Sequence, residues 1–425
     1  MTDNISTNFS YMGFNALSNS EYAYNVEQVE ELTDDKYALG DSISLACTST
    51  KLLRSVNGLK NVDITPKTNA GANLLATITG VAVSPNNTAL VVGTNPAGVT
   101  TAPVLFSPNG INFSKSANTL AINARCVTYY NYLHSFLVGC TSTAAAAFSN
   151  AVLVCTQQGV VTSGLVNTLF PNIGDMCNAI STSDKGSAAA AASVTGLTGV
   201  ILYGGQFGGG NVAFGFDTDR VAAGTVFVGG ANLPAGAGSI NAISNDNGIL
   251  DNSFVYTLAG GSYTAGGGAS NLVYNFRAVG TNPAANNAWV APTSFDTIFP
   301  LGVANSSVNA IAFNGQYFLV GGLGTVGVNT NTCTVAIATF TIAAAADPAA
   351  QGTIDLAIPT GCNIANLMTN VRSLAWNGLY WIAGGDNTGG FVYARSTDAV
   401  TWTLIGGAIE GATSGLSVSS RFTPQ

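Results

Sequence analysis

The clearest pattern of hydrophobic and polar positions along the chain is a pair of alternating runs joined by Asn-Gly. One copy spans residues 308–322 (VNAIAFNGQYFLVGG) and a second spans residues 371–385 (VRSLAWNGLYWIAGG). Alternation with a period of two is typical of a half-buried strand. Asn-Gly between two such runs predicts a type I′ hairpin turn, because both of its central residues need a positive φ. Each copy therefore predicts a β-hairpin that ends in a pair of glycines.

Weaker copies of this pattern recur along the rest of the chain. The spacing between equivalent positions is about 45 to 70 residues, the range for a four-stranded propeller blade with variable loops. Six repeats are counted in this way. Their equivalent positions are Val81, Val127, Ile180, Ile243, Ile311 and Leu374.

The two ends of the chain together supply a seventh repeat. Residues 37–63 match the second half of a repeat that lacks its first strand, and residues 415–422 can supply that strand. Closing a ring in this way removes two free sheet edges. We predict an all-β fold, a β-propeller of seven four-stranded blades over residues 35–425, closed by pairing the C-terminal strand with the N-terminal blade. Residues 1–34 are predicted to form a separate N-terminal arm.

The composition is poor in charge and rich in small polar residues. Only 8% of the 425 residues are charged, and 21 acidic against 13 basic residues give a net charge of −8. No basic cluster is present to neutralise a phosphate backbone, so nucleic acid is not expected as a partner. Apolar stretches are interrupted well before membrane-spanning length, so no membrane insertion is expected. The first residues lack the pattern of a secretory signal, which leaves the localisation open, although the neutral polar composition is common on extracellular and particle-exterior proteins.

The cysteines are scattered through strand-like sequence and form no C-x-x-C pair. This spacing predicts buried, reduced thiols rather than a metal or redox site. Cys126 and Cys140, expected on adjacent strands, are the one pair for which a disulfide is considered. The seven cysteines are Cys47, Cys126, Cys140, Cys155, Cys177, Cys333 and Cys362.

A second motif stands in the later half of two repeats. Residues 394–402 (ARSTDAVTW) and 106–113 (FSPNGINF) resemble the Ser-x-Asp-x-Gly-x-Thr-Trp turn, or Asp-box, of sialidase-like propellers. Val400 stands in place of the usual glycine in the first copy, and Asn109 and Phe113 replace the aspartate and tryptophan in the second. The glycine pairs also resemble those of kelch-like blades.

The resemblance implies a propeller fold and a structural role for the box residues. Ser396 and Asp398 are expected to hydrogen-bond the backbone of their own turn, and Trp402 is expected to pack between blades. Membership of an enzyme family does not follow from these turns.

Catalytic residue types are scarce. A sialidase-like site would need an arginine cluster, a Tyr–Glu pair and an acidic Asp, yet the chain has only five glutamates, four within residues 21–31 and one at 410. Two aspartates could still serve a glycosidase, but no spacing singles out a pair. His134 is the only histidine, and its strand-like context favours a structural role. We predict that the chain is not an enzyme and has no catalytic residue and no cofactor.

Residues 245–251 (NDNGILD) place oxygen ligands at alternating positions. Asp246 and Asp251 are therefore candidates for a calcium site, although a plain turn explains the segment as well. The glycine runs at 208–210 and 266–268 lack the strand-to-helix context and the lysine of a phosphate loop, so we predict loops there.

Aromatic residues stand among asparagine and serine in the first 34 residues. Such side chains need a surface to cover, either the propeller's own face or a partner protein. We predict an interaction arm or a ring face that contacts a protein partner. The candidate contact residues of the arm are Phe9, Tyr11, Phe14, Tyr22 and Tyr24.

Three functions remain open. The first is a non-catalytic structural or adhesive propeller displayed on a particle or cell surface; the resemblance implies a virion surface or capsid-associated protein of a large DNA virus. The second is a carbohydrate-binding propeller or weak sialidase-like glycosidase, although three of its tryptophans stand at core positions. The third is an intracellular protein-interaction scaffold. The tryptophans that the second function would use are Trp289, Trp376, Trp381 and Trp402.

Overall fold

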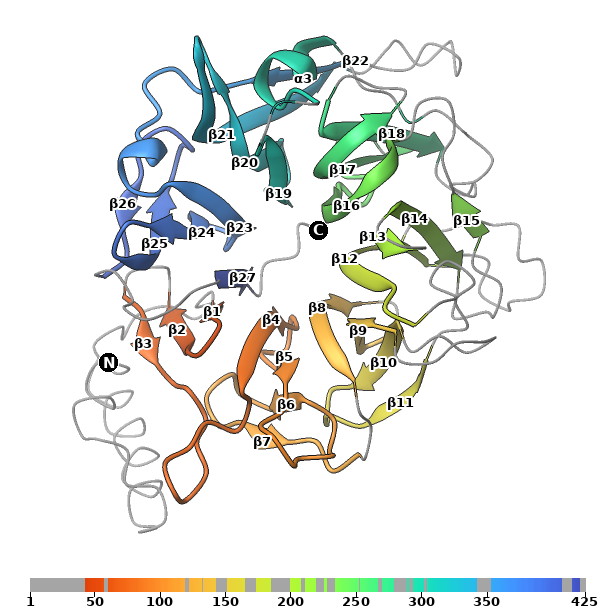
Figure 1. Cartoon of the computed structure of the whole chain (residues 1–425), viewed down its shortest axis with the longest axis vertical. Helices are drawn as coiled ribbons and strands as arrows, with labels where there is room; N and C mark the ends of the chain where they lie inside the picture. The colour runs from red at the N-terminus through yellow and green to blue at the C-terminus, as the bar shows by residue number, and fades with distance from the viewer. Residues whose placement is uncertain are drawn as a thin grey trace, which may run out of the picture. The chain divides into compact units, whose positions relative to one another are not determined.

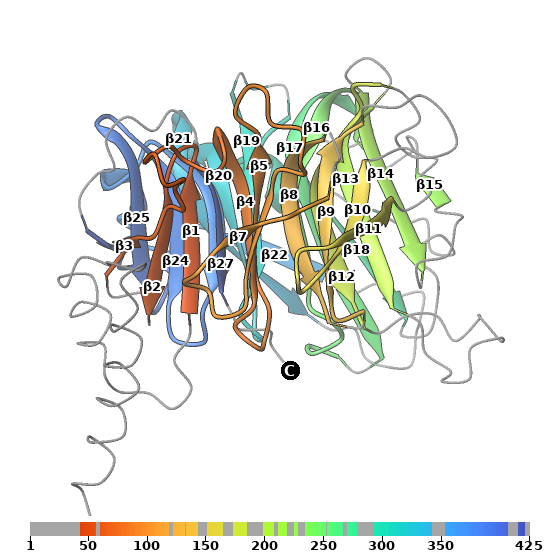
Figure 2. The same cartoon turned by 90° about the horizontal axis from the view of Figure 1, so that it is seen from below.

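The chain is a β-propeller, as the computed structural model shows (Figure 1). It divides into two compact units, Met1–Asp41 and Ser42–Gln425, and every described residue lies in the second unit. The sheets of this unit stand in a ring with one strand of each facing the centre (Figure 1), and the strands run along the axis of the ring (Figure 2). The structure describes residues 43–56, 60–118, 122–131, 133–142, 151–164, 173–184, 199–207, 211–218, 225–227, 234–251, 253–266, 270–278, 289, 293–301, 303, 305–341, 353–406 and 415–420.

Four blades are separate four-stranded antiparallel sheets, and we name each blade by its innermost strand. The β27 blade contains β27 (Gly415–Ser420), β1 (Ile43–Thr48), β2 (Leu52–Val56) and β3 (Val62–Asp63), and the β4 blade contains β4 (Thr77–Val83), β5 (Ala89–Thr94), β6 (Val104–Ser107) and β7 (Ser114–Lys115). The β19 blade contains β19 (Ser307–Phe313), β20 (Phe318–Val326), β21 (Asn329–Thr341) and β22 (Thr353–Ala357), and the β23 blade contains β23 (Asn370–Trp376), β24 (Trp381–Asn387), β25 (Gly390–Ser396) and β26 (Thr403–Leu404).

The other eleven strands form one sheet, because single residue pairs connect neighbouring units: Thr141 with Met176, and Asn211 with Ala237. This sheet contains the β8 blade, with β8 (Asn123–Tyr130), β9 (Ser135–Thr141), β10 (Val152–Thr156) and β11 (Val161–Gly164), and the β12 blade, with β12 (Met176–Ser183), β13 (Val200–Phe207), β14 (Asn211–Thr218) and β15 (Thr225–Phe227). It ends in the β16 unit, with β16 (Pro234–Asn245), β17 (Phe254–Gly266) and β18 (Leu272–Ala278). Two short helices follow, α3 (Thr293–Ile298) and the 3₁₀ helix η2 (Ile364–Asn366).

The predicted count of seven four-stranded blades is corrected: among the described residues six blades have four strands, and the β16 unit has three. After β18 the described chain forms α3 and no fourth strand. Phe295, Ile298 and Phe299 follow the i, i+3, i+4 spacing of a helix, and their buried side chains pack with Tyr274 of β18. The N–H of Asn271 donates to the carbonyl oxygen of Phe299 at 2.8 Å. This helical segment therefore packs beside β18.

Both ends of the described chain meet in the β27 blade. β27 pairs with β1 in antiparallel fashion, with Ala46 opposite Val418, which confirms the predicted closure. Val418 packs with Ile382 and Tyr393 of the β23 blade. Seven hydrophobic clusters of this kind fill the spaces between the described sheets, and each is shared by two neighbours. The core of the propeller therefore lies between the blades.

The Asn-Gly hairpins have longer turns than predicted. Four residues connect β19 to β20, and among them only Gly315 has a positive φ, at 99°. Asn314 Oδ1 accepts the N–H groups of Gln316 and Tyr317, each at 2.9 Å, and the turn at Asn377 is built in the same way. The predicted type I′ turn is therefore wrong, because the asparagine side chain and one glycine close the turn.

Every innermost strand carries a β-bulge at the same place in the repeat, where one residue is skipped in the pairing with its neighbour. In β19 the skipped residue is Asn309. In chain order from β4 to β23, the skipped residues are Thr79, Arg125, Asn178, Asn241, Asn309 and Arg372. In β27 the skipped residue is Leu416.

The bulge explains the glycine pair that follows on the second strand. A Cβ at Gly322 would overlap the backbone carbonyl oxygen of Ser307, which the bulge pushes toward it. A Cβ at Gly321 would overlap the side chain of Val371 in the next blade. The second glycine is therefore required by the bulge, and the first by the packing of the neighbouring blade.

The skipped residues also link neighbouring blades. Asn309 Nδ2 donates to Asn370 Oδ1 at 3.0 Å and to the carbonyl oxygen of Val371 at 3.1 Å, both in the next blade. We call these links the inter-blade belt. Its members are Thr79, Arg125, Asn178, Asn241 and Asn309, each of which hydrogen-bonds the following blade or unit.

Replacing Gly322 by alanine should lower the free energy of unfolding by about 3 kcal/mol, because the new methyl group meets a backbone carbonyl that cannot move without breaking the bulge. Gly327→Ala is the matched control in the same hairpin: its φ is +63° and no atom lies near its Cβ position, so only a backbone cost of about 1 kcal/mol is expected. Urea unfolding of both variants tests this. Equal losses would contradict the bulge explanation.

Candidate functional site

A cavity of about 250 Å³ lies where the innermost strands of four neighbouring units end. These strands are β16, β19, β23 and β27. The lining has a polar wall at the end of β16 and an apolar part from β19, β23 and β27, and Ser419 of β27 adds a hydroxyl. The polar wall includes Ser244, Asn245, Asp246 and Asn247, and the apolar part includes Ile311, Phe313, Leu374, Trp376 and Val418.

The polar wall is held rigidly by the adjacent β12 blade. Asn245 Nδ2 donates to Ser181 Oγ at 2.6 Å and to the carbonyl oxygen of Thr182 at 2.9 Å. Asn247, at φ 53°, accepts the hydroxyl of Ser183 and the N–H of Asp184 through its Oδ1, both at 2.9 Å. These bonds fix the two amides before any ligand arrives.

Asp246 is fully buried behind this wall and serves the turn. Its carboxylate accepts three backbone N–H groups: those of Gly248 and Tyr256 at Oδ1, at 3.1 and 2.8 Å, and that of Leu250 at Oδ2, at 3.1 Å. Burial raises the pKa of Asp246 to about 6, and the three N–H groups offset part of that rise. Its oxygens are therefore occupied by the protein itself.

The two candidate calcium ligands, Asp246 and Asp251, both hydrogen-bond the backbone of their own turns. Asp251 accepts the N–H of Ser253 at 2.8 Å and pairs with the residues that follow, while Asp246 binds its own loop. No group of three or more His, Cys, Asp or Glu side chains in the described ranges could hold a metal ion.

Of the four candidate tryptophans, the cavity uses one. Trp376 lines it and is only half-buried, with its ring centroid 5.2 Å from that of Trp381. Trp381 and Trp402 are buried in the cluster between the β19 and β23 blades, and Trp289 is buried in the cluster between the β12 blade and the β16 unit. Sequence position alone did not separate Trp376 from the core tryptophans.

The Asp-box-like turn between β25 and β26 is closed by its own side chains. Asp398 Oδ1 accepts the hydroxyl of Ser396 and the N–H groups of Val400 and Thr401, each at 2.8 Å. These bonds hold the pKa of Asp398 below its ordinary value, with the N–H of Thr401 the largest cause. Trp402 Nε1 donates to the carbonyl oxygen of Ala399 at 3.0 Å.

The second copy uses the same bonds with an amide. Asn109 Oδ1 accepts the hydroxyl of Ser107 and the N–H groups of Ile111 and Asn112, each at 3.0 Å. Asparagine can replace aspartate there because only acceptor oxygens are required.

His134 and the cysteines lie away from the cavity. His134 is exposed in the turn between β8 and β9 at φ 47°, so the strand-like context predicted for it is wrong. All seven cysteines are free thiols, so the pair Cys126–Cys140 is not bonded. Burial raises the pKa of Cys47, Cys155 and Cys333 to about 12, which makes these thiols poor nucleophiles.

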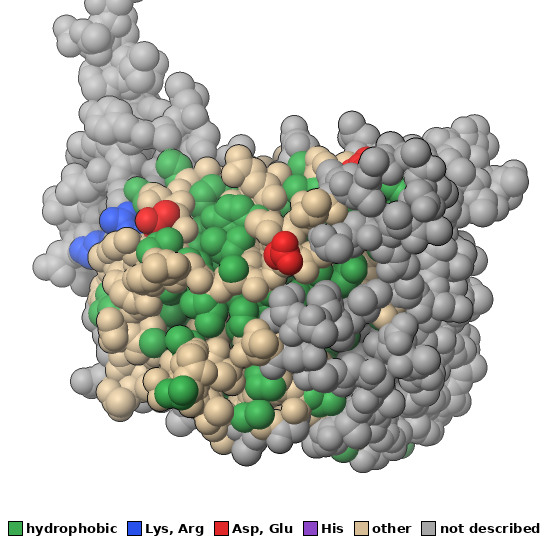
Figure 3. Space-filling model, turned by 90° about the horizontal axis from the view of Figure 1, so that it is seen from above, with side chains coloured by type: hydrophobic (Ala, Val, Ile, Leu, Met, Phe, Trp, Pro, Cys, Tyr) green, Lys and Arg blue, Asp and Glu red, His purple; other side chains and the backbone are tan. Residues whose placement is uncertain are grey.

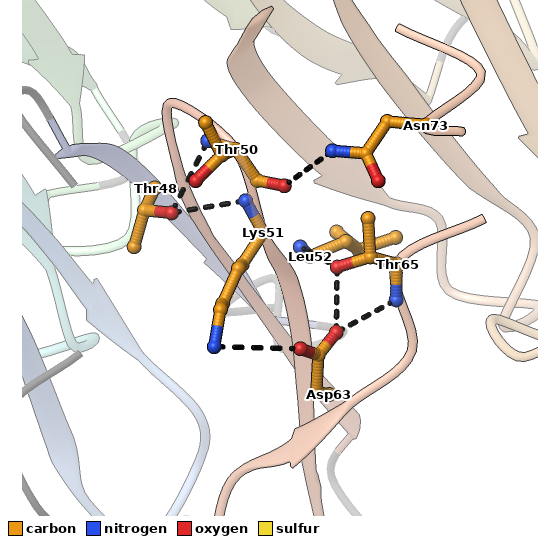
Figure 4. Close-up of polar contacts among 7 residues, drawn as sticks. All are labelled: Thr48, Thr50, Lys51, Leu52, Asp63, Thr65 and Asn73. Atoms are coloured by element: carbon orange, nitrogen blue, oxygen red, sulfur yellow. Dashed lines mark hydrogen bonds and ion pairs between the residues drawn. The ribbon is translucent and has the colours of Figure 1, made fainter. Parts of the chain in front are cut away.

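A polar network fixes the turn between β1 and β2, at the end of the β27 blade that lies away from the cavity (Figure 4). Asp63 accepts the hydroxyl of Thr65 at 2.6 Å and lies 3.7 Å from Lys51 Nζ, and Asn73 Nδ2 donates to the carbonyl oxygen of Thr50 at 3.1 Å. The side chains of the ion pair are 43% and 45% exposed, so it contributes at most about 1 kcal/mol. This network therefore stabilises the turn between β1 and β2.

The described surface is mostly uncharged. On the face shown in Figure 3, hydrophobic and neutral polar side chains predominate, with few acidic or basic ones. None of the described helices has the length and apolar character that crossing a membrane requires. The predicted arm residues at 9, 11, 14, 22 and 24 lie outside the described residues.

Comparison with known proteins finds solved structures of low sequence identity. No protein-family model and no curated protein matches the sequence. Among solved structures, the chain is similar to a protein from Lactobacillus plantarum, with a TM-score of 0.49 and 12% identity over 89% of this chain and 99% of that one. It is also similar to a chain of a nidogen/laminin complex, with a TM-score of 0.44 and 7% identity over 90% and 98%. The resemblance to sialidase-like or kelch-like propellers stays a prediction.

The raised pKa of Asp246 gives a pH dependence with a definite sign. Because its folded pKa of about 6 exceeds its ordinary 3.8, the folded state binds the proton more tightly, and the free energy of unfolding should fall by roughly 2–3 kcal/mol as pH rises from 4 to 6.5. Asp246→Asn removes this contribution. Urea unfolding of both proteins at several pH values should give curves that differ in slope over this range, and parallel curves would contradict the assignment.

Proposed function

We propose that this propeller works by binding or assembly rather than by catalysis, as a structural or adhesive protein displayed on the surface of a particle or cell. A surface or capsid-associated protein of a virion is the specific form that the resemblance favours. The observation that carries the proposal is the state of the cavity's carboxylate. Asp246 is the one acid among the described lining residues, and backbone N–H groups occupy both of its oxygens.

Two further features support a non-catalytic role. General acid–base chemistry needs a proton-transfer group within hydrogen-bond reach of the substrate, and the remaining described lining side chains are amides, hydroxyls and apolar groups. The inter-blade belt and the buried clusters make a rigid scaffold whose described surface carries little charge. Such a scaffold suits a component that presents a fixed surface.

The decisive test counts copies of the chain in purified particles or envelopes of the source by quantitative mass spectrometry, before and after a salt wash. High copy number that resists the wash is the expected result. Absence from these fractions would contradict the surface role. Turnover of fluorogenic glycosides that Asp246→Asn abolishes would contradict the non-catalytic part.

Carbohydrate binding is a second candidate, favoured by the mixed lining of the cavity. An aromatic face opposite amides and hydroxyls fits the apolar face and the hydroxyl groups of a sugar ring. Trp376 supplies the aromatic face, and Asn245 and Asn247 stand on the polar wall.

Replacing Trp376 by alanine should weaken binding of any glycan found by array screening at least tenfold, because the aromatic contact surface is lost. Trp376→Phe should keep most of the affinity, and Leu379→Ala, an exposed residue outside the cavity, is the control expected to change nothing. Calorimetry with the hit glycan measures all three. Binding that survives Trp376→Ala would place the glycan elsewhere on the protein.

A further inference from the structure

The seam between the β27 blade and the β23 blade changes character along its length. Its apolar part contains Ala46 and Leu53 on one side and Ile382 and Tyr393 on the other. Toward the start of β1, the next side chains that face the seam are polar in both blades.

Two serines form the polar side of the β27 blade. Ser44 and Ser55 pair directly across β1 and β2, two residues beyond the pair Ala46–Leu53. Side chains alternate along a strand, so both hydroxyls face the β23 blade like Ala46 and Leu53. The serines are 2% and 4% exposed, and neither hydroxyl has a hydrogen-bond partner in the described part of the chain.

The β23 blade places a guanidinium on its side of the seam. Arg395 pairs with Ile382 and stands two residues beyond Tyr393, so it shares their face. Its Cζ lies 4.8 Å from the centroid of the Tyr380 ring, which orients the group. Its Nη1 is buried and lacks an acceptor among the described residues.

A fourth unpaired donor stands at the same end of this blade. Asn377 is 2% exposed, and its Oδ1 accepts the N–H groups of Leu379 and Tyr380 at 3.0 and 2.7 Å. Its Nδ2 is buried without a partner in the described ranges. Asn377 and Arg395 therefore both contact Tyr380, the amide at its backbone N–H and the guanidinium at its ring.

These four groups share one property: each can donate a hydrogen bond. A buried donor without an acceptor costs about 1–3 kcal/mol, and more when it is charged. By contrast Arg372, on the innermost strand of the same blade, is 45% exposed and pairs with Asp386 at 2.9 Å. Arg395 is half-buried, and its buried Nη1 is a charged donor without an acceptor among the described residues. An acceptor with negative charge suits this group of donors.

We propose that the seam binds an oxyanion, a carboxylate or phosphate group, between Arg395, Ser44, Ser55 and Asn377. The planar guanidinium suits two parallel hydrogen bonds to such a group, and the hydroxyls and amide supply the remaining donors. None of these four residues lines the cavity, and the proposal does not rest on the proposed function.

The test measures binding of two probes, inorganic phosphate and acetate, by calorimetry and by thermal unfolding against sodium chloride at matched ionic strength. The wild type should bind at least one of them saturably, and the better probe distinguishes a phosphate from a carboxylate source. Arg395→Gln should weaken that binding at least tenfold, while the matched control Arg372→Gln should retain it. In buffer free of both probes, Arg395→Gln should unfold at an equal or higher temperature, because a buried donor without an acceptor is removed.

Other outcomes overturn the proposal. Saturable binding that is equal in the wild type and Arg395→Gln would show that the anion binds elsewhere, and no binding of either probe to the wild type would mean that water alone fills the seam. Should Arg395→Gln fail to fold, Ser55→Ala removes one donor without changing the charge. It should weaken binding about threefold to tenfold, and an unchanged affinity would contradict the site.

Discussion

The β-bulge on each innermost strand is the constraint on which the rest of the propeller depends. In the β19 blade it turns one side chain out of the pairing and brings the carbonyl oxygen of Ser307 toward the second strand, where Gly322 leaves room for it. In the β19 blade, Asn309 thereby reaches Asn370 in the next blade, and Gly321 lets Val371 approach. One local irregularity therefore fixes both the hairpin within a blade and the contact between blades.

The cavity inherits its rigidity from this arrangement. The belt sets the positions of β16, β19 and β23 relative to one another, and these strands end at the cavity. Asn245 and Asn247 then bond to the β12 blade, and the carboxylate of Asp246 fixes the loop between them and β17. The amides that a ligand would meet are held by the fold before binding, which lowers the entropy lost when a ligand is bound.

The sequence predicts the repeat because the constraint is local. Alternation, the Asn-Gly turn and the glycine pair recur within about fifteen residues, so the hairpins and the closing strand could be found. The spacing of Phe295, Ile298 and Phe299 is also a helical signal, and it predicts the helix α3 that follows β18 in the described part of the chain. The cavity could not be found in this way, because Asn245, Trp376 and the closing strand are far apart in the chain.

The closing seam differs chemically from the other interfaces. Along the chain each belt residue reaches the following unit, but Arg372, the last of the series, pairs with Asp386 in its own blade. The closing blade is tied instead by the Tyr393 hydroxyl, which donates to the carbonyl oxygen of Cys47 at 2.7 Å, and on its far side by Ser417, which bonds the β4 blade. The interface between the β23 and β27 blades thus lacks a belt link and has unpaired buried donors at its end. An anion bound there would supply the link between first and last blades that the bulge supplies elsewhere.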